Sequence, residues 1–206
     1  MRLYHEINGC SLAVDIVRRE LQIALELIWV DVPNKRLPDG SDYFDVNSKG
    51  QVPTLELDDG QRMTEGAVIM QYLADSYPEY DLIPAVGTLG RYRVLEWLNY
   101  FGMELHKSCF TPLFRKTTPN EYRQIVLQTL NARLAWMDGQ LQGREYLTGS
   151  SFTIADAHGY TIAMWTRLHK VDTSAWPHLE AFLDRVGSRP SVMAAKEAER
   201  EAKALV

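Results

Sequence analysis

Residues 2–13 read RLYHEINGCSLA and contain the signals that decide the first part of the fold. Arg2–His5 has the composition of a short strand, and the apolar residues of Ser11–Leu21 recur on one face of a helix. A turn through Gly9 and Cys10 joins the two. The stretch therefore predicts a strand, a turn and a helix with a cysteine at its entrance.

A cysteine at a helix entrance has two chemical uses. The first turn of a helix carries unpaired N–H groups and the positive end of the helix dipole, which lower a thiol pKa from about 8.5 to roughly 3.5–7.5. The same groups can stabilise the thiolate of a bound ligand. The competing interpretation is that Cys10 is a small buried apolar residue. Position 13 is alanine, so no Cys-x-x-Cys pair is present and a dithiol cycle is disfavoured.

Strands and helices alternate through the first third of the chain. Asp58-Asp59-Gly60 predicts a tight hairpin turn between two strands, because Asp-Gly tolerates the positive φ angles required there. The alternation is typical of a small mixed sheet covered by helices. The expected segments are strands at Leu25–Val32, Val52–Leu57 and Gln61–Met63, a helical turn at Asp42–Val46, and a helix from Thr64-Glu65-Gly66 to Ser76.

The chain then changes character. Two prolines and several polar residues mark a linker, whose core is residues 81–87, between a domain at 1–80 and a helical domain at 88–206. Pro112 interrupts one apolar run of the helical domain. The expected helices are Leu89–Lys107, Glu121–Leu141, Thr153–His169, Pro177–Ser188 and Val192–Leu205.

Composition narrows the class of protein. The formal net charge is −5 and no run of Lys or Arg forms a basic patch, which argues against a nucleic-acid partner. No stretch approaches the roughly 20 apolar residues of a membrane span, and we expect no signal peptide. Two cysteines and scattered histidines lack metal-ligand spacing, so no metal site is expected. The sequence predicts a cytoplasmic protein.

Two short motifs in the first domain suggest a peptide-like ligand. A cis bond in Val52-Pro53 would turn the backbone groups of Val52 away from the sheet, although a proline also commonly just begins a strand. At the next helix start, Glu65 can accept an ammonium group while the N–H groups that follow it bind a carboxylate. An amino-acid head group carries both charges on one carbon. The competing interpretation of Thr64-Glu65-Gly66 is an ordinary helix cap.

Asn99 and His106 are the candidate polar residues of the long helix at 89–107. Their spacing of seven places both on one face of an α-helix that is otherwise largely apolar. A satisfied histidine between two packed helices is the ordinary explanation. Histidine also exchanges protons near neutral pH, so His106 is a candidate partner for a thiol.

Asp156 and Cys109 receive structural interpretations. Thr153-Ile154-Ala155-Asp156 has the spacing of a capping box, with aspartate in place of the usual glutamate. We therefore favour a role for Asp156 in helix stability over a catalytic one. Cys109 is interpreted as structural or incidental.

The combined motifs resemble those of the glutathione transferases, specifically the bacterial beta class, over essentially the whole chain. The residues that carry the resemblance are Gly9-Cys10-Ser11-Leu12-Ala13, Asp42-Tyr43-Phe44, Val46-Asn47, Lys49-Gly50-Gln51-Val52-Pro53, Thr64-Glu65-Gly66, Ile69–Asp75, Glu96–Tyr100, Glu104–Lys107 and Phe152–Asp156. The resemblance implies a thioredoxin-like N-terminal domain with a mixed four-stranded sheet, an all-helical C-terminal domain and a homodimer.

The resemblance also implies a function and roles for individual residues. The activity would be conjugation of the glutathione thiolate to hydrophobic electrophilic small molecules, with glutathione as co-substrate, no cofactor, and peroxidase or thiol-exchange side activity. Cys10 and His106 would act on the sulfur. Further glutathione contacts would be Lys35, Val52, Glu65, Gly66 and Asn99, and the electrophile would rest against Phe114, Trp165 and Leu168.

Two positions depart from the family pattern. His5 stands near a strand end where the family often has a tyrosine, and Gly66 stands where many relatives have a serine. Two alternative functions remain open from the sequence. One is a thiol oxidoreductase that uses Cys10 covalently, and the other is a non-catalytic adaptor like the stringent starvation proteins.

Overall fold

The computed structural model describes residues 1–204 of the chain. It contains two compact units, one formed by Met1–Leu82 together with the segment from Arg189 on, and one formed by Ile83–Ser188. The two are called here the sheet unit and the helical unit.

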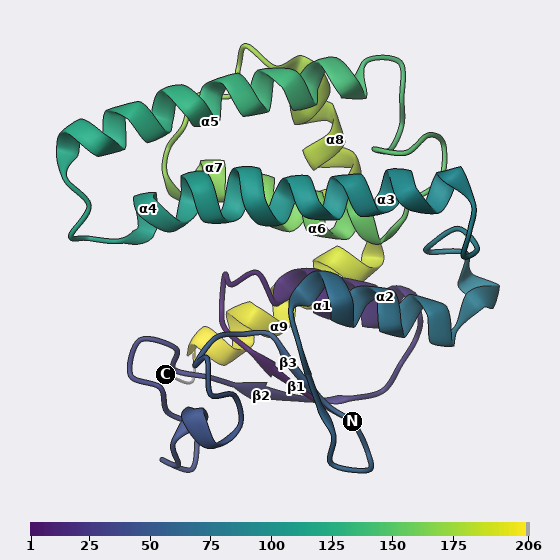
Figure 1. The fold of residues 1–206 in the computed structure, drawn as a ribbon, viewed down its shortest axis with the longest axis vertical. Coiled ribbons are helices and arrows are strands. Elements are labelled where there is room, and N and C mark those ends of the chain that lie inside the picture. The colour runs from purple at the N-terminus through teal and green to yellow at the C-terminus, as the bar shows by residue number, and fades with distance from the viewer. Residues whose placement is uncertain (205–206) are drawn as a thin grey trace. The chain divides into compact units, whose positions relative to one another are not determined.

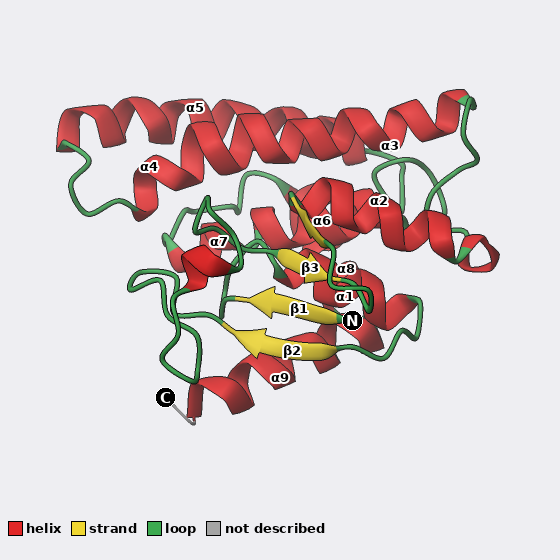
Figure 2. Ribbon diagram, turned by 60° about the horizontal axis from the view of Figure 1, so that its bottom comes forward, coloured by secondary structure: helices red, strands yellow, loops and turns green. Residues whose placement is uncertain are grey.

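The sheet unit is built on four short strands. They are β1 (Arg2–His5), β2 (Glu26–Trp29), β3 (Thr54–Glu56) and β4 (Arg62–Thr64), in the order β2-β1-β3-β4. β1 pairs in parallel with β2 and antiparallel with β3, and β3 pairs antiparallel with β4. Figure 2 shows β2, β1 and β3 side by side. The mixed four-stranded sheet expected from the sequence is confirmed.

Three α-helices belong to the sheet unit: α1 (Leu12–Glu20), α2 (Gly66–Ser76) and α9 (Pro190–Ala204). Two 3₁₀ turns, Tyr43–Asp45 and Pro78–Tyr80, complete it. α1 packs against both α2 and α9, and Figure 1 shows α9 alongside α1. The sequence-based division placed α9 in the helical domain, as part of 88–206. The structure groups α9 with the sheet unit, where it packs against α1. Val192 and Ala195 are among its buried residues.

Alternation along β1 separates two environments. Successive side chains of a strand point to opposite faces. The ring of Tyr4 lies 5.9 Å from that of Tyr43, in a cluster with Val30 on one face. The fully buried His5 points to the other face and contacts α9. One polar side chain of the strand is thus buried beneath the C-terminal helix.

The helical unit contains α3 (Leu89–Asn99), a π-helical segment (Tyr100–Phe110), α4 (Thr111–Phe114), α5 (Asn120–Leu141), α6 (Ile154–Ala163), α7 (Trp165–Leu168) and α8 (Pro177–Gly187). The expected single α-helix at 89–107 is therefore wrong in its second half, where the ladder changes to i→i+5 bonds. The helix expected at 153–169 is interrupted at Met164. α5 runs alongside α3 and the π-helical segment in both ribbon views (Figures 1 and 2).

The core of the helical unit surrounds α6, all ten residues of which are buried. A Cβ added at Gly159 would lie 2.7 Å from the ring of Phe101, so only glycine permits this approach between α6 and the π-helical segment. The capping box is present: the Asp156 carboxylate accepts the N–H groups of Leu147 and Thr153 and the Thr153 hydroxyl. These bonds confirm a capping role for Asp156. No helix within residues 1–204 is long and apolar enough to span a bilayer.

Candidate functional site

Cys10 lies directly before α1. Ser11 is the N-cap of that helix, and the Cys10 carbonyl accepts the N–H of Ala13 at 3.3 Å. The thiol is half-buried and donates to the carbonyl oxygen of Val52 at 3.4 Å. The cysteine therefore stands at the helix entrance, as the sequence predicted, with its sulfur against the backbone of a second segment.

That second segment is Lys49–Pro53, called here the Val52 loop. Its Val52–Pro53 bond is cis, and β3 begins only after it, at Thr54. Among residues 1–204 we find no hydrogen bond from the Val52 N–H. The carbonyl oxygen of Val52 thus accepts from Cys10, and the Val52 N–H is a donor that a bound molecule could use.

Buried polar side chains hold the Val52 loop in place. The Tyr43 hydroxyl donates to the Gln51 carbonyl at 2.9 Å, and the Asn47 amide donates to the same oxygen at 2.7 Å. Asn47 also contacts the hydroxyl of Thr54, and its carbonyl side-chain oxygen accepts the Lys49 N–H. Tyr43 and Asn47 belong to the motifs that carry the family resemblance, but the sequence did not indicate a role for either residue. Their supporting role depends on tertiary contacts and has no signature of its own in the sequence.

Glu65 precedes α2 with a backbone φ of 68°, an uncommon left-handed conformation for a residue other than glycine. Its carboxylate makes no cap bond to the helix. The carboxylate is exposed and accepts a hydrogen bond from the Lys49 ammonium at 2.5 Å. The same ammonium also donates to the Thr64 hydroxyl at 2.9 Å. The first intrahelical donor of α2 is Val68, so the N–H groups of Gly66 and Ala67 point out of the helix start. The arrangement offers a carboxylate and two amide donors at adjacent positions.

Lys35 adds a cation at Gly50, the residue next to Lys49 in the Val52 loop. It too has a left-handed φ, 57°, and its ammonium donates to the Gly50 carbonyl at 2.7 Å. One short loop therefore contacts Cys10 through Val52, Lys35 through Gly50 and Glu65 through Lys49. The structure therefore brings all the glutathione-contact candidates of the sheet unit together around the Val52 loop.

The candidates of the helical unit separate into two environments. Asn99 is exposed at the end of α3, and its amide donates to the Leu95 carbonyl at 2.9 Å. His106 is half-buried in the π-helical segment, with its ring 4.9 Å from Trp165 in an edge-on contact. The prediction that Asn99 and His106 share one face rested on an α-helical period. That reasoning was wrong, because the segment Tyr100–Phe110 is π-helical.

An aromatic cluster adjoins His106. The ring of Trp165, which contacts His106, also contacts Phe114 at 5.2 Å and Phe110 at 5.5 Å, and the ring of His169 lies 4.6 Å from Phe114. Two of the three electrophile-pocket candidates therefore belong to this cluster, Trp165 against His106 and Phe114 against Trp165. Leu168, the third, is 46% exposed.

His169 was missed by the sequence reasoning. Its Nε2 atom is buried without a hydrogen-bond partner within the described chain. Burial, reinforced by nearby Arg123, lowers the pKa of His169. The only signal available in the sequence is its position one residue after the Leu168 candidate.

Cys109 is fully buried and chemically quiet. Its thiol donates to the Glu104 carbonyl at 3.2 Å, and burial raises its pKa to about 11. Cys10 is therefore the sulfur of interest. In the part of the chain that the structure covers, no group of three or more His, Cys, Asp or Glu side chains is arranged to hold a metal ion.

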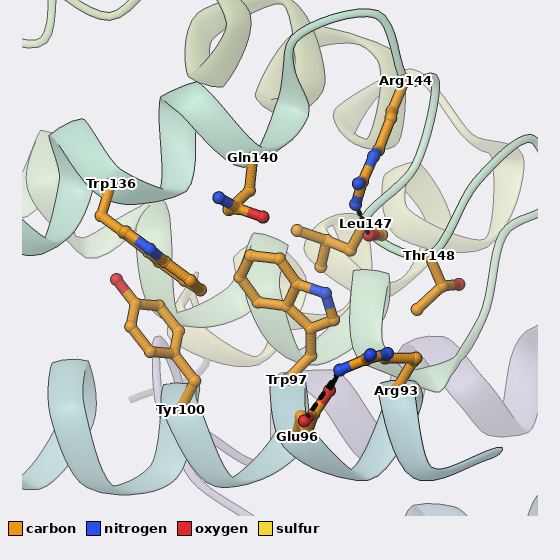
Figure 3. A pocket seen from close by; sticks show the side chains of 9 residues that line it. All are labelled: Arg93, Glu96, Trp97, Tyr100, Trp136, Gln140, Arg144, Leu147 and Thr148. Carbon is orange, nitrogen blue, oxygen red and sulfur yellow. Dashed lines mark hydrogen bonds and ion pairs between the residues drawn. The ribbon is translucent and has the colours of Figure 1, made fainter. Parts of the chain in front are cut away.

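A cavity of about 830 Å³ lies in the helical unit (Figure 3). Trp97, Tyr100 and Trp136 form an aromatic wall, with ring centroids 4.7–5.5 Å apart. Figure 3 shows Gln140 and Arg144 on the side opposite the α3 residues. None of the predicted site residues lines this cavity.

Comparison with known proteins settles the family. Residues 9–76 match the model of the glutathione S-transferase N-terminal domain, and residues 100–190 match that of the glutathione S-transferase C-terminal domain. The chain is 45% identical over 199 residues to glutathione S-transferase GstA of Escherichia coli O157:H7, covering 97% of this chain and 98% of that protein. The chain belongs to the glutathione S-transferase family.

Solved structures agree with this assignment. A ternary complex of BphK, a bacterial glutathione S-transferase, superposes with a TM-score of 0.94 at 42% identity, over 97% of this chain and 99% of that one. A beta class glutathione S-transferase from Sphingomonas chungbukensis gives a TM-score of 0.93 at 37% identity, over 97% and 98%. A sphingomonad glutathione S-transferase complexed with glutathione gives 0.92 at 37% identity, over the same shares.

The comparisons confirm the resemblance to the bacterial beta class and the thioredoxin-like and helical parts of the fold. The protein is a glutathione S-transferase, an enzyme rather than the adaptor left open by the sequence.

Proposed function

We propose that this glutathione S-transferase holds glutathione along the Val52 loop and transfers its thiolate to hydrophobic electrophiles. The observation that supports the proposal most directly is the convergence of Cys10, Lys35 and Glu65 on that one loop. A relative described as a ternary complex supports a second substrate beside the first.

Each part of the tripeptide has a matching group in the sheet unit. The Val52 N–H and carbonyl suit the cysteinyl backbone. The Glu65 carboxylate suits the γ-glutamyl ammonium, and the N–H groups of Gly66 and Ala67 at the positive end of α2 suit the γ-glutamyl carboxylate. The ammonium of Lys35 suits the second carboxylate of the tripeptide. In this proposal glutathione displaces the Lys49 ammonium from Glu65.

Activation of the thiol is assigned to Cys10 and His106. Cys10 now donates to Val52, and in the complex it would donate to the glutathione sulfur and favour the thiolate. His106 would take up or return the thiol proton, and Asn99 would be a further glutathione contact. A thiolate is the attacking species because it is far more nucleophilic than the thiol.

The electrophile is proposed to rest on the aromatic cluster near His106. Phe114 is 46% exposed beside the buried Trp165, which offers an apolar surface for a planar or hydrophobic compound. Leu168 is a further candidate. The ring of His169 packs against Phe114 beside this surface, with its Nε2 atom buried.

Assembly and location complete the proposal. The family resemblance favours a homodimer acting in the cytoplasm, where thiols are kept reduced. Light scattering on the purified enzyme tests the dimer directly, and a monomeric mass at working concentration would contradict it.

Calorimetry with glutathione tests the binding proposal. Glu65→Gln removes the charge opposite the ligand ammonium, so we expect binding about tenfold or more weaker, as for a lost charged hydrogen bond. Glu79→Gln, an exposed carboxylate of the same unit, is the matched control and should bind like the wild type. Absence of heat at millimolar glutathione in the wild type would overturn the proposal.

A second experiment separates the two possible uses of Cys10. Cys10→Ala should retain part of the conjugation activity if Cys10 only donates a hydrogen bond. It should abolish glutathione-dependent disulfide exchange, which needs a covalent mixed disulfide. Complete loss of both activities would favour the thiol oxidoreductase over the transferase as the main role of this residue.

A further inference from the structure

Glu199 is a nearly buried carboxylate on α9, with a side chain only 7% exposed. Its Oε1 atom lies 2.9 Å from Nε2 of His5 and accepts the backbone N–H of Asn8 at 3.1 Å. His5 ends strand β1, and Asn8 lies two residues before Cys10. The C-terminal helix therefore binds the segment that leads from the sheet to the cysteine.

That segment, Glu6–Gly9, has a well-defined shape. The Gly9 N–H donates to the Glu6 carbonyl at 3.0 Å, and the Glu6 N–H donates to the hydroxyl of Ser11 at 3.1 Å. Asn8 adopts a left-handed φ of 58°, a conformation that asparagine tolerates better than most residues with a side chain. Glu199 supplies a contact to the Asn8 N–H from outside the loop.

The burial of His5 makes the contact strong. His5 is fully buried, its ring packs edge-on against Trp29 at 4.8 Å, and its Nδ1 has no partner among the described residues. Because a carboxylate only accepts, Nε2 is the atom that donates to Glu199. Removal of Glu199 would leave both nitrogens of a buried imidazole without a partner, a costly arrangement that favours rearrangement of β1's end.

An ion pair at the start of α9 joins it to the far end of α1. The guanidinium of Arg189, the residue directly before α9, donates to both oxygens of Glu20 at 2.8 Å. The C-terminal segment thus contacts α1 at its C-terminal end through Glu20 and contacts the approach to its N-terminal end through Glu199. Of these two contacts, the Glu199 contact is the one to the segment that leads to the cysteine.

We propose that Glu199 is a positioning residue for Cys10, holding the Glu6–Gly9 turn so that the thiol stands at the N-terminal end of α1. The inference rests on the proposed role of Cys10 toward glutathione. It adds the side-chain carboxylate of Glu199 on α9, together with His5, to the residues on which the role of Cys10 depends.

The test compares the rate of Cys10 alkylation by iodoacetamide at about pH 7 with the rate at about pH 9, without glutathione. The ratio of the two rates reports how readily the thiol ionises. Differences in thiol accessibility between variants affect both rates alike and therefore cancel in the ratio. Glu199→Ala should lower the ratio by roughly an order of magnitude, because the thiol loses its place at the helix end. Glu199→Gln, which keeps an acceptor for the Asn8 N–H, should restore part of it.

Glu20→Ala is the matched control. It removes the other attachment of α9 to α1, so it should lower the melting temperature while leaving the ratio unchanged. Equal ratios in Glu199→Ala and the wild type would overturn the proposal, as would an equal drop in Glu20→Ala. Should Glu199→Ala fail to fold, the comparison of Glu199→Gln with Glu20→Gln decides in the same way. Failure of glutathione to bind the wild type would instead count against the proposed function, which the alkylation ratio does not measure.

Discussion

The thiol of Cys10 donates to the carbonyl oxygen of Val52 at 3.4 Å, which joins the start of α1 to the loop that precedes β3. These two segments are 42 residues apart in the chain. The contact places the sulfur next to the backbone of Val52, and the proposed binding of a peptide thiol rests on this geometry.

The two cysteines should differ sharply in reactivity. Cys10 is half-buried at a helix entrance, whereas Cys109 is fully buried with its pKa raised to about 11 by burial. We expect mass spectrometry to find one alkylated cysteine in the native protein and two after denaturation. In Cys10→Ser no native alkylation should remain, and fast labelling of Cys109 in that variant would contradict the burial described here.

Replacement of Gly66 by serine should strengthen glutathione binding. An added Cβ would lie 3.4 Å from Pro53 Cγ, an ordinary contact, and the hydroxyl would join the N–H groups that are proposed to bind the γ-glutamyl carboxylate. One added hydrogen bond to a charged group corresponds to about tenfold in the dissociation constant measured by calorimetry. Gly90→Ser is a close control, since its Cβ would meet Pro84 at the same 3.4 Å in the first turn of α3. An equal gain in both variants would mean that the hydroxyl does not reach the ligand.

Asn47→Ala should weaken glutathione binding indirectly, through the shape of the Val52 loop. The amide of Asn47 holds the Gln51 carbonyl at 2.7 Å, directly before Val52. Loss of a buried hydrogen bond costs about 1–2 kcal/mol, which here would appear as a loop less well placed and binding roughly 5- to 30-fold weaker. Asn34→Ala, which removes a surface bond to Asp31, should leave binding unchanged. Unaltered affinity in Asn47→Ala would show that the Val52 loop keeps its shape without this side chain.

His158 should make the protein less stable in acid. Burial, with a smaller contribution from His106, lowers the pKa of His158 from 6.5 to about 3. Between these values the unfolded chain binds a proton that the folded chain excludes, so stability rises with pH over this range and is complete above 6.5. The loss on acidification amounts to about 1.4 kcal/mol per pH unit.

His158→Leu should flatten this dependence in urea unfolding measured as a function of pH. The substitution also removes Nδ1, a buried atom without a partner in the described chain, so it should not lower stability at neutral pH by more than about 1–2 kcal/mol. His178→Gln, at a half-buried position, serves as the control and should keep the wild-type slope. An unchanged slope in His158→Leu would assign the acid sensitivity to other groups.

Much of the fold was predictable because periodicity reports it locally. The strand at Arg2–His5, the hairpin turn at Asp58–Gly60 and the capping box at Thr153–Asp156 each rest on a few neighbouring residues, and each is present. The change from i→i+4 to i→i+5 bonds after Asn99 was missed, because the sequence reasoning assumed an α-helical period throughout residues 89–107.

The supporting contacts of the site were equally hidden. The bonds from Tyr43 and Asn47 to Gln51 depend on how a loop returns to the sheet, and that geometry leaves no period in the sequence. The same holds for α9. Its amphipathic pattern predicts a helix, but the pattern does not say which of the two units buries its apolar face.

The position of α9 has a consequence for biosynthesis. The helical unit is one continuous segment, Ile83–Ser188, so all of it is translated before Pro190. The sheet unit is begun first but completed later, because α1 and the imidazole of His5 wait for α9 to cover them. We therefore expect the first eighty residues of this enzyme to expose an apolar flank until α9 has left the ribosome, the period in which a nascent chain is most open to chaperones.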